Sequence, residues 1–369
     1  MADKLLFTPG PLTTSRTVKE AMLRDLGSRD SEFIAKVHFI RNELLAAAGV
    51  SKEKGYESII IQGSGTFGIE SVISSSIPKT GHLLILVNGV YGDRIAKMAA
   101  IHAIPHTCLV FAEDQTPDLE LLSSTLSENT AITHVATIHC ETTTGIINPI
   151  QEIGAICASH GKTYIVDAMS SFGAYPIIFE ACSIDYLISS SNKCIEGVPG
   201  FSFVIAKKAS LLSCENQARS LSLDLFAQWK GLENDGQFRF TPPTHSLLAF
   251  AQALVELNKE GGVEGRAARY KNNYTILSEG MKKMGFVEYL EDEKRGYIIT
   301  CFHYPTHPNF NFKEFYSALS EKGFVIYPGK LSKVDCFRIG NIGRISDLDI
   351  QSLLLAIKET LIAKDIRLV

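Results

Sequence analysis

The sequence carries none of the short motifs that mark a hydrolytic metal centre or a redox-active thiol pair. Its ten histidines include no H-E-x-x-H motif, and its eight cysteines form no C-x-x-C pair. We therefore expect no metal site. We expect the cysteines to be reduced, mostly buried thiols of a cytoplasmic protein.

Long apolar runs and strong net charge are also absent. No apolar run approaches the roughly 20 residues that span a bilayer. Residues 1–7 hold no extended apolar core before Pro9 that would indicate a secretory signal. A net charge of -4 implies no strongly basic face. We expect neither a membrane nor a nucleic acid as a partner, and 45% hydrophobic with 21% charged residues is typical of a globular enzyme.

Short apolar runs alternate with helix-like stretches between about residue 57 and residue 190. The predicted buried strands cover residues 58–61, 83–87, 107–111, 132–138, 163–166 and 186–189. The predicted helices cover residues 68–77, 93–102, 119–126 and 150–160. This alternation predicts an α/β fold with a mostly parallel sheet that helices cover on both faces. Ligands of such sheets bind at the carboxyl ends of the strands.

The pattern changes after this region. Residues 201–205 predict an antiparallel strand, because the link from the preceding strand is too short for a crossover helix. A helical region at 246–284 is broken near Gly261 and Gly262. The remaining elements are strands at 296–303, 324–327 and 336–339 and helices at 312–322 and 347–363. We predict a large domain over residues 1–260, which includes the N-terminal segment, and a small α+β domain over residues 261–369.

Lys193 and Asp167 form the most informative pair of residues. Asp167 follows the predicted strand at 163–166, and Lys193 follows the one at 186–189. A lysine amine can bind the aldehyde of pyridoxal 5'-phosphate, and a carboxylate can keep the pyridine nitrogen protonated so that the ring accepts electrons. Either residue alone has an ordinary explanation, since most lysines are solvated surface charges. Cys194, beside the lysine, is interpreted as a packed thiol, because no histidine is close in sequence.

A glycine-rich run lies between a predicted strand and a predicted helix, at residues 62–68 (Q-G-S-G-T-F-G). Its small residues let an anion approach the helix N-terminus, and Ser64 and Thr66 add hydroxyl donors. It matches neither a P-loop nor a convincing dinucleotide fingerprint. An ordinary helix cap stays open as an alternative. Tyr91 begins the next helix, where its ring is placed either to stack on a flat cofactor or simply to pack.

Eight segments together resemble the class V aminotransferases, enzymes of pyridoxal phosphate fold type I. These segments span nearly the whole chain in the expected order: residues 6–15, 27–33, 63–66, 88–94, 166–171, 190–193, 239–245 and 337–343. The lysine and glycine-loop motifs are common to the class. The two N-terminal segments and the segment around Arg338 are similar to the branch that acts on phosphonates.

The resemblance implies an activity and a role for each site residue. The activity is transfer of the amino group of 2-aminoethylphosphonate to pyruvate, in a cytoplasmic homodimer that degrades phosphonates. The alternative pairs are alanine with glyoxylate and serine with pyruvate. The implied cofactor-binding residues are Ser64, Gly65, Thr66, Tyr91, Thr143 (or Thr142), Asp167, Asn192, Lys193 and Thr241, the last reaching the phosphate of the neighbouring subunit. Lys193 and Asp167 are the implied catalytic residues. Arg338 is the implied ligand of the acid group of the substrate, although alone it would be read as a surface ion pair.

Other classes of function stay open from the residues alone. A cysteine desulfurase-like lyase would need a mobile catalytic cysteine, and none is obvious. A nucleotide- or nicotinamide-binding protein would use the glycine loop for phosphate. A non-catalytic scaffold would leave Lys193, Asp167 and the glycine loop without a joint explanation.

Overall fold

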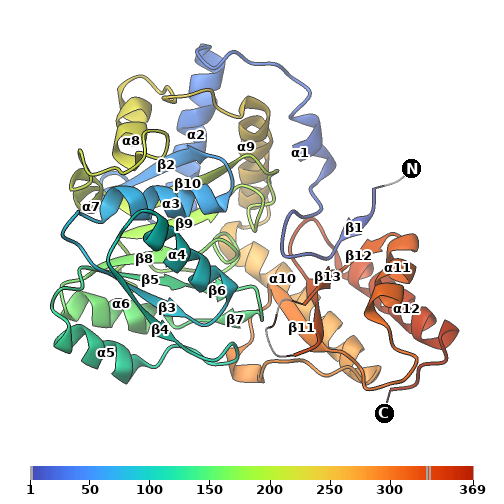
Figure 1. The fold of residues 1–369 in the computed structure, drawn as a ribbon. Coiled ribbons are helices and arrows are strands. Elements are labelled where there is room, and N and C mark those ends of the chain that lie inside the picture. Colours follow the sequence, from blue (N-terminus) through green and yellow to red (C-terminus); the bar gives the residue numbers. More distant parts are fainter. Residues whose placement is uncertain (1–2, 330, 332–333, 369) are drawn as a thin grey trace.

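Seven strands form the main sheet in the computed structural model, which describes residues 3–329, 331 and 334–368 (Figure 1). Their order across the sheet is β2-β10-β9-β8-β5-β3-β4. The predicted strands are confirmed with end shifts of up to two residues: β2 (Tyr56–Gln62), β3 (Leu83–Val87), β4 (His106–Val110), β5 (His134–Ile138), β8 (Thr163–Asp167), β9 (Tyr186–Ser190) and β10 (Phe201–Lys207).

The strand directions bring the carboxyl ends of six strands to one edge of the sheet. Strands β9, β8, β5, β3 and β4 pair parallel in succession. Strand β10 pairs antiparallel with both β9 and β2, as predicted, so β2 runs in the same direction as β9. The loops that follow β2, β3, β5, β8 and β9 therefore meet at the same edge.

The predicted helices between the strands are confirmed, and two of them begin three residues earlier than expected. They are α3 (Gly65–Ser76), α4 (Val90–Ile101), α5 (Leu119–Glu128) and α6 (Ile150–Ser159). The sequence analysis did not anticipate four further helices: α1 (Arg16–Glu20), α2 (Ser31–Ala47), α7 (Lys208–Leu212) and α8 (Leu225–Asn234). Helices α2 and α8 both contact β2 and so cover that end of the sheet.

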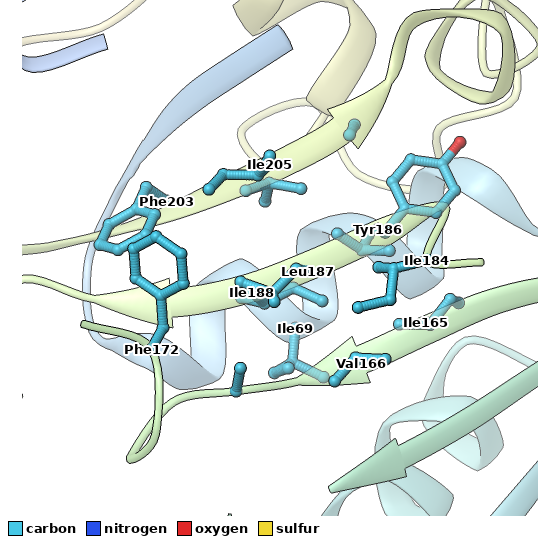
Figure 2. Packing of buried hydrophobic residues seen from close by; sticks show 14 of the residues in the cluster. Ile69, Ile165, Val166, Phe172, Ile184, Tyr186, Leu187, Ile188, Phe203 and Ile205 are labelled. Carbon is cyan, nitrogen blue, oxygen red and sulfur yellow. The ribbon is translucent and has the colours of Figure 1, made fainter. Parts of the chain in front are cut away.

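Branched aliphatic and aromatic side chains fill the space between the main sheet and its helices (Figure 2). Helix α3 lies against β9 and β10, and Figure 2 shows Ile69 of α3 beside Ile188 of β9. Phe172 and Phe203 make an edge contact with ring centroids 5.5 Å apart. Burying each such side chain contributes about 1.5–3 kcal/mol, so the sheet edge that carries the functional loops rests on a rigid support.

The rest of the chain forms a smaller sheet with its own helices. Helices α9 (Thr244–Lys259) and α10 (Gly262–Lys283) are separated at Gly261, whose φ of +98° lies in the left-handed region, so the predicted break is confirmed. The smaller sheet has the order β11-β14-β13. Its elements and flanking helices are β11 (Ile299–His303), α11 (Phe312–Glu321), β13 (Tyr327–Pro328), β14 (Cys336–Gly340) and α12 (Asp347–Ala363).

One strand prediction in this region is wrong. Residues 324–327 form two short strands, because β12 (Phe324–Val325) pairs parallel with β1 (Leu5–Leu6), whereas β13 pairs antiparallel with β14. The pairing partner of β12 lies at the other end of the chain. A pattern confined to neighbouring residues therefore could not reveal the division.

Two of the three buried clusters support a division of the chain near residue 260, and the third joins residues from both sides of it, so the division stays a prediction. One cluster draws on residues 18–257, and the other draws on residues 277–366 together with Phe7. The N-terminal strand thus packs with the C-terminal cluster, beside β12 (Figure 1). Among the described residues, no helix is long and apolar enough to cross a membrane.

Candidate active site

A cavity of about 180 Å³ lies at the carboxyl edge of the main sheet. Its lining residues come largely from the segments that follow β2, β3, β5, β8 and β9. These segments meet because the five strands run in the same direction. Seven of the predicted site residues line it: Ser64, Gly65, Thr66, Tyr91, Asp167, Asn192 and Lys193. Thr143, Thr241 and Arg338 lie outside the lining and are described separately below.

Lys193 lies three residues beyond the end of β9 and is half-buried. Burial lowers the pKa of its amine, because the charged form loses its hydration. Its Nζ donates to the carbonyl oxygen of Pro9. A Cβ at Gly10 would lie 2.9 Å from that Nζ, so the N-terminal segment can approach the amine only through a glycine. The N-terminal segment thus closes one side of the site.

Asp167 is the last residue of β8 and presents its carboxylate to the same cavity. Burial raises its pKa to about 6, and the N–H of Met169 together with the charges of Lys193 and Arg94 opposes that rise. The Met169 N–H to Oδ1 distance is 2.9 Å. This hydrogen bond holds the carboxylate in one orientation, which suits a group that must face a ring nitrogen.

The loop between β2 and α3 forms an open anion cup. Ser64 is the N-cap of α3, yet its side chain makes no capping hydrogen bond and remains available to a ligand. A Cβ at Gly65 would collide with the sulfur of Met169, so any larger residue would displace the floor of the cavity. The helix N-terminus adds unpaired N–H groups and a favourable dipole. These features favour the anion site over an ordinary cap.

Tyr91 lies in the first turn of α4, where its N–H bonds to a buried carboxylate. Gly89, the N-cap of α4, has no side chain to cap the helix, and Glu141 takes that role from another loop. The Glu141 carboxylate also accepts from the N–H and the hydroxyl of Thr143. Burial raises the pKa of Glu141 to about 7. Glu141 is not among the residues predicted from the sequence, and it joins the loops that carry Tyr91 and Thr143.

The structure distinguishes Thr142 from Thr143. Both are buried, but Thr142 lines the cavity, whereas the hydroxyl of Thr143 donates to Glu141. Both belong to the turn between β6 (Cys140–Glu141) and β7 (Ile146–Ile147). The geometry therefore favours Thr142, the alternative weighed from the sequence, as the threonine that faces a cofactor, and Thr143 as its support.

Arg338 is a fully buried cation next to the cavity. Its guanidinium donates to the carbonyl oxygen of Pro328 at 2.9 and 3.0 Å and to that of Thr142 at 2.6 Å. Burial lowers the pKa of Arg338, and the charge of Arg338 in turn lowers the pKa of Lys193. Among the described residues no carboxylate forms an ion pair with it, so the surface ion pair considered from sequence does not occur there. A buried and unneutralised guanidinium is suited to an anionic ligand.

Thr241 lies apart from the cavity of its own chain. It is exposed and lines a separate groove with Ser28, Arg29 and the segment 237–242. Gln62, at the end of β2, donates through Nε2 to the carbonyl oxygen of the neighbouring Phe240 at 2.9 Å. The groove is therefore anchored near the anion cup, but Thr241 does not contribute to the site within one chain.

Other nucleophile and metal candidates gain no support from the geometry. Burial raises the pKa of Cys194 to about 12, and its thiol donates to the carbonyl oxygen of Ser170, so it is not an activated nucleophile. The sequence contains two histidine pairs with H-x-x-x-H spacing that the motif search did not include: His102 with His106, and His303 with His307. Among the described residues, no group of three His, Cys, Asp or Glu side chains could hold a metal ion.

The residues present fit pyridoxal 5'-phosphate on three separate chemical demands. The buried amine of Lys193 suits an aldehyde, the carboxylate of Asp167 suits a pyridine nitrogen, and the uncapped Ser64 with its helix N-terminus suits a phosphate. Tyr91 lines the same cavity with an aromatic ring. Met169 packs against the cup this closely only because residue 65 has no Cβ.

Comparisons with known proteins agree with this chemistry. The family model "Aminotransferase class-V" matches residues 14–346. The chain is 52% identical over 356 residues to the 2-aminoethylphosphonate–pyruvate transaminase of Salmonella typhimurium, covering 96% of both chains. The transaminase of the same name from Salmonella dublin is equally similar, at 52% identity and 96% coverage of both chains.

Solved structures show the same fold. The alanine–glyoxylate aminotransferase of Nostoc sp. matches with a TM-score of 0.91 at 23% identity, covering 98% of this chain and 96% of that one. The ureidoglycine–glyoxylate aminotransferase of Bacillus subtilis also matches with a TM-score of 0.91 at 21% identity, covering 100% and 95%. At these identities the likeness shows the fold alone, and it confirms fold type I.

Proposed function

The chain belongs to the class V aminotransferase family, and from this premise we propose that it transfers the amino group of 2-aminoethylphosphonate to pyruvate. The products are phosphonoacetaldehyde and L-alanine. The observation that carries the proposal is a half-buried lysine and a buried aspartate on one cavity, in a chain that is 52% identical to transaminases of this name over 96% of its length.

The cofactor is pyridoxal 5'-phosphate, on which the class depends. When bound, it supplies an electrophilic aldehyde and a ring that accepts electrons. The carboxylate of Asp167 would hold a proton at the ring nitrogen. Ser64, Gly65 and Thr66 would hold the phosphate with backbone N–H groups and hydroxyls, and Tyr91 would contribute its aromatic ring to the binding of the cofactor ring.

Lys193 moves the proton of the reaction. Because burial lowers the pKa of its Nζ, the free amine is a better proton acceptor near neutral pH than a surface lysine would be. With the cofactor bound, Lys193 Nζ would accept the proton from the carbon that bears the donor amine and pass it to the cofactor. In the second half of the exchange it would carry a proton the opposite way, to the carbon of pyruvate that receives the amino group. The N-terminal segment at Pro9 and Gly10 covers this amine and excludes water from its side of the cavity.

Arg338 binds the acid group of each substrate in turn. Its planar fork can hold a phosphonate or a carboxylate with two parallel hydrogen bonds. The carbonyl groups of Pro328 and Thr142 hold the guanidinium in place before a substrate arrives. One preformed cation therefore serves both halves of the reaction.

A panel of amino donors with pyruvate tests the substrate assignment. Purified protein loaded with pyridoxal phosphate should release alanine fastest with 2-aminoethylphosphonate. Alanine with glyoxylate and serine with pyruvate are the competing pairs and should react more slowly. Faster turnover of either competing pair would contradict the phosphonate assignment while leaving the aminotransferase assignment intact.

We also propose that the active form is a homodimer in which Thr241 of each subunit completes the phosphate site of the other. The exposure of Thr241 and its separation from the cavity of its own chain support this arrangement. Light scattering during size exclusion should give twice the mass of the chain, and full activity in a monomer would contradict the proposal.

We further propose a cytoplasmic location, which the eight scattered cysteines without a C-x-x-C pair support, since thiols stay reduced there. Cell fractionation should find the protein with cytoplasmic markers. Recovery with periplasmic or membrane markers would contradict this proposal.

A further inference from the structure

Arg94 places a positive charge over the cavity without a carboxylate to neutralise it. The residue lies in α4, one turn after Tyr91, and its side chain lines the cavity. Among the described residues, no Asp or Glu forms an ion pair with it. The charge of Arg94 lowers the pKa of Asp167, the carboxylate that lines the cavity, but the two side chains form no ion pair. Asp93, its chain neighbour, is exposed on α4.

Two contacts aim the guanidinium at the anion cup. Its Nη1 donates to the hydroxyl of Thr66 at 3.3 Å, and its Cζ lies 4.9 Å from the centroid of the Tyr91 ring. Tyr91 and Arg94 are three residues apart on one helix, so they share a face. The same helical face therefore offers a flat ring and, beside it, a cation that already touches the cup.

The cup itself lacks a formal positive charge. Its donors are the N–H groups at the start of α3 and the hydroxyls of Ser64 and Thr66. A phosphate monoester carries nearly two negative charges at neutral pH. A half-buried dianion held by neutral donors alone would be poorly compensated, and a guanidinium within reach changes that balance.

We propose that Arg94 is a further cofactor-binding residue, which pairs with the phosphate of pyridoxal phosphate through its guanidinium. This inference rests on the proposed function, since it assumes that cofactor. A competing role for Arg94 is to fix the Tyr91 ring by a cation–π contact. In that role it would contribute equally to the binding of pyridoxal phosphate and of pyridoxal, which lacks the phosphate.

Binding of two ligands to the apoprotein separates the two roles. Apoprotein is titrated with pyridoxal 5'-phosphate and with pyridoxal, which has the same ring but no phosphate, and each dissociation constant is read from the absorbance of the bound form. The variants are Arg94→Gln, Arg94→Lys and, as a matched control, Lys97→Gln. Lys97 is an exposed cation one turn further along α4, so its loss removes the same charge from the same helix.

We expect Arg94→Gln to weaken pyridoxal phosphate binding by about 10- to 100-fold, the effect of losing hydrogen bonds to a charged group. Pyridoxal binding should change by less than about threefold. Arg94→Lys should recover part of the loss, because it restores the charge without the planar fork. Lys97→Gln should bind both ligands as the wild type does.

Inorganic phosphate gives a second measurement that needs no bound cofactor. It should raise the melting temperature of wild-type apoprotein, and the rise should be smaller in Arg94→Gln. Equal losses for both aldehydes, or unchanged binding of both, would overturn the role of Arg94. Failure of wild-type apoprotein to bind pyridoxal phosphate at all would instead overturn the proposed function.

Discussion

Replacing Glu196 with glutamine should destabilise the protein through the loop that carries Lys193. Glu196 is 3% exposed and accepts from Arg269 at 2.7 Å and from the hydroxyl of Tyr270 at 2.6 Å. The fully buried Arg266 lies 3.4 Å from the same carboxylate oxygen. Removing the charge from this buried carboxylate costs about 3 kcal/mol, because Arg266 and Arg269 then share a single carboxylate, that of Glu260, and water cannot replace the lost partner.

The network of these residues reaches from the Lys193 loop to the strand of Arg338. The Tyr270 hydroxyl accepts the N–H of Gly343, which follows β14, and Arg269 donates to the carbonyl oxygen of the same glycine. Arg266 donates to the carbonyl oxygen of Cys194. Loss of the carboxylate should therefore loosen the position of Arg338 relative to Lys193 as well as the fold.

Thermal melting measures the stability effect. Unfolding entropy is about 2.1 cal/mol/K per residue, so a 369-residue chain loses roughly 4 °C for 3 kcal/mol. Glu264→Gln is the matched control, since Glu264 is an exposed acid of α10. It should shift the midpoint by less than about 1 °C. A Glu196→Gln midpoint no lower than that of the control would refute the reasoning.

A double-mutant cycle tests whether the contacts act together. Tyr270→Phe removes one donor to Glu196 and the acceptor for Gly343. Combined with Glu196→Gln, it should cost less than the two single changes added, by about 1 kcal/mol, because glutamine already weakens the shared hydrogen bond from a charge-assisted to a neutral one. Strict additivity would show that the two side chains stabilise the protein independently.

Two further predictions concern the site. Arg338→Ala should lower kcat/KM for both 2-aminoethylphosphonate and pyruvate by about 100-fold, because about 3 kcal/mol of charge-assisted hydrogen bonding is lost. The absorbance of the bound cofactor should not change. Unaltered kinetics for both substrates would show that Arg338 does not bind them. Because burial raises the pKa of Glu141 from 4.5 to about 7, the folded state binds its proton more tightly than the unfolded chain and loses up to roughly 3 kcal/mol as pH rises through that window. Glu141→Gln should therefore show a shallower fall in melting temperature between pH 5 and pH 8, and an equally steep fall would contradict the assignment.

Local patterns were sufficient to predict the main sheet and its catalytic edge. Strands of the parallel sheet are buried on both faces and read as short apolar runs, so β3 was predicted to the residue. Strand direction then placed Asp167 and Lys193 at one edge. Helix α2 carried a usable signal that was not applied: an N-cap at Asp30 and buried apolar residues at 33, 37, 40 and 44.

Contacts between distant loops lay beyond such patterns. Glu141 caps a helix that begins 51 residues earlier, at Val90. No sequence pattern near residue 141 predicts this contact. Arg94 reads as an ordinary helical arginine until α3 and α4 are packed together. The burial of Arg338 decides between an anion site and a surface ion pair. This burial also depends on segments far from Arg338 in the chain.

Borohydride reduction of the loaded protein tests the central claim most directly. Reduction converts the bond between a lysine and the aldehyde into a stable amine, and peptide mapping then locates the tagged residue. We expect one label, on Lys193, and none in Lys193→Ala. A label on another lysine, or no label on protein that has retained its cofactor, would contradict the account.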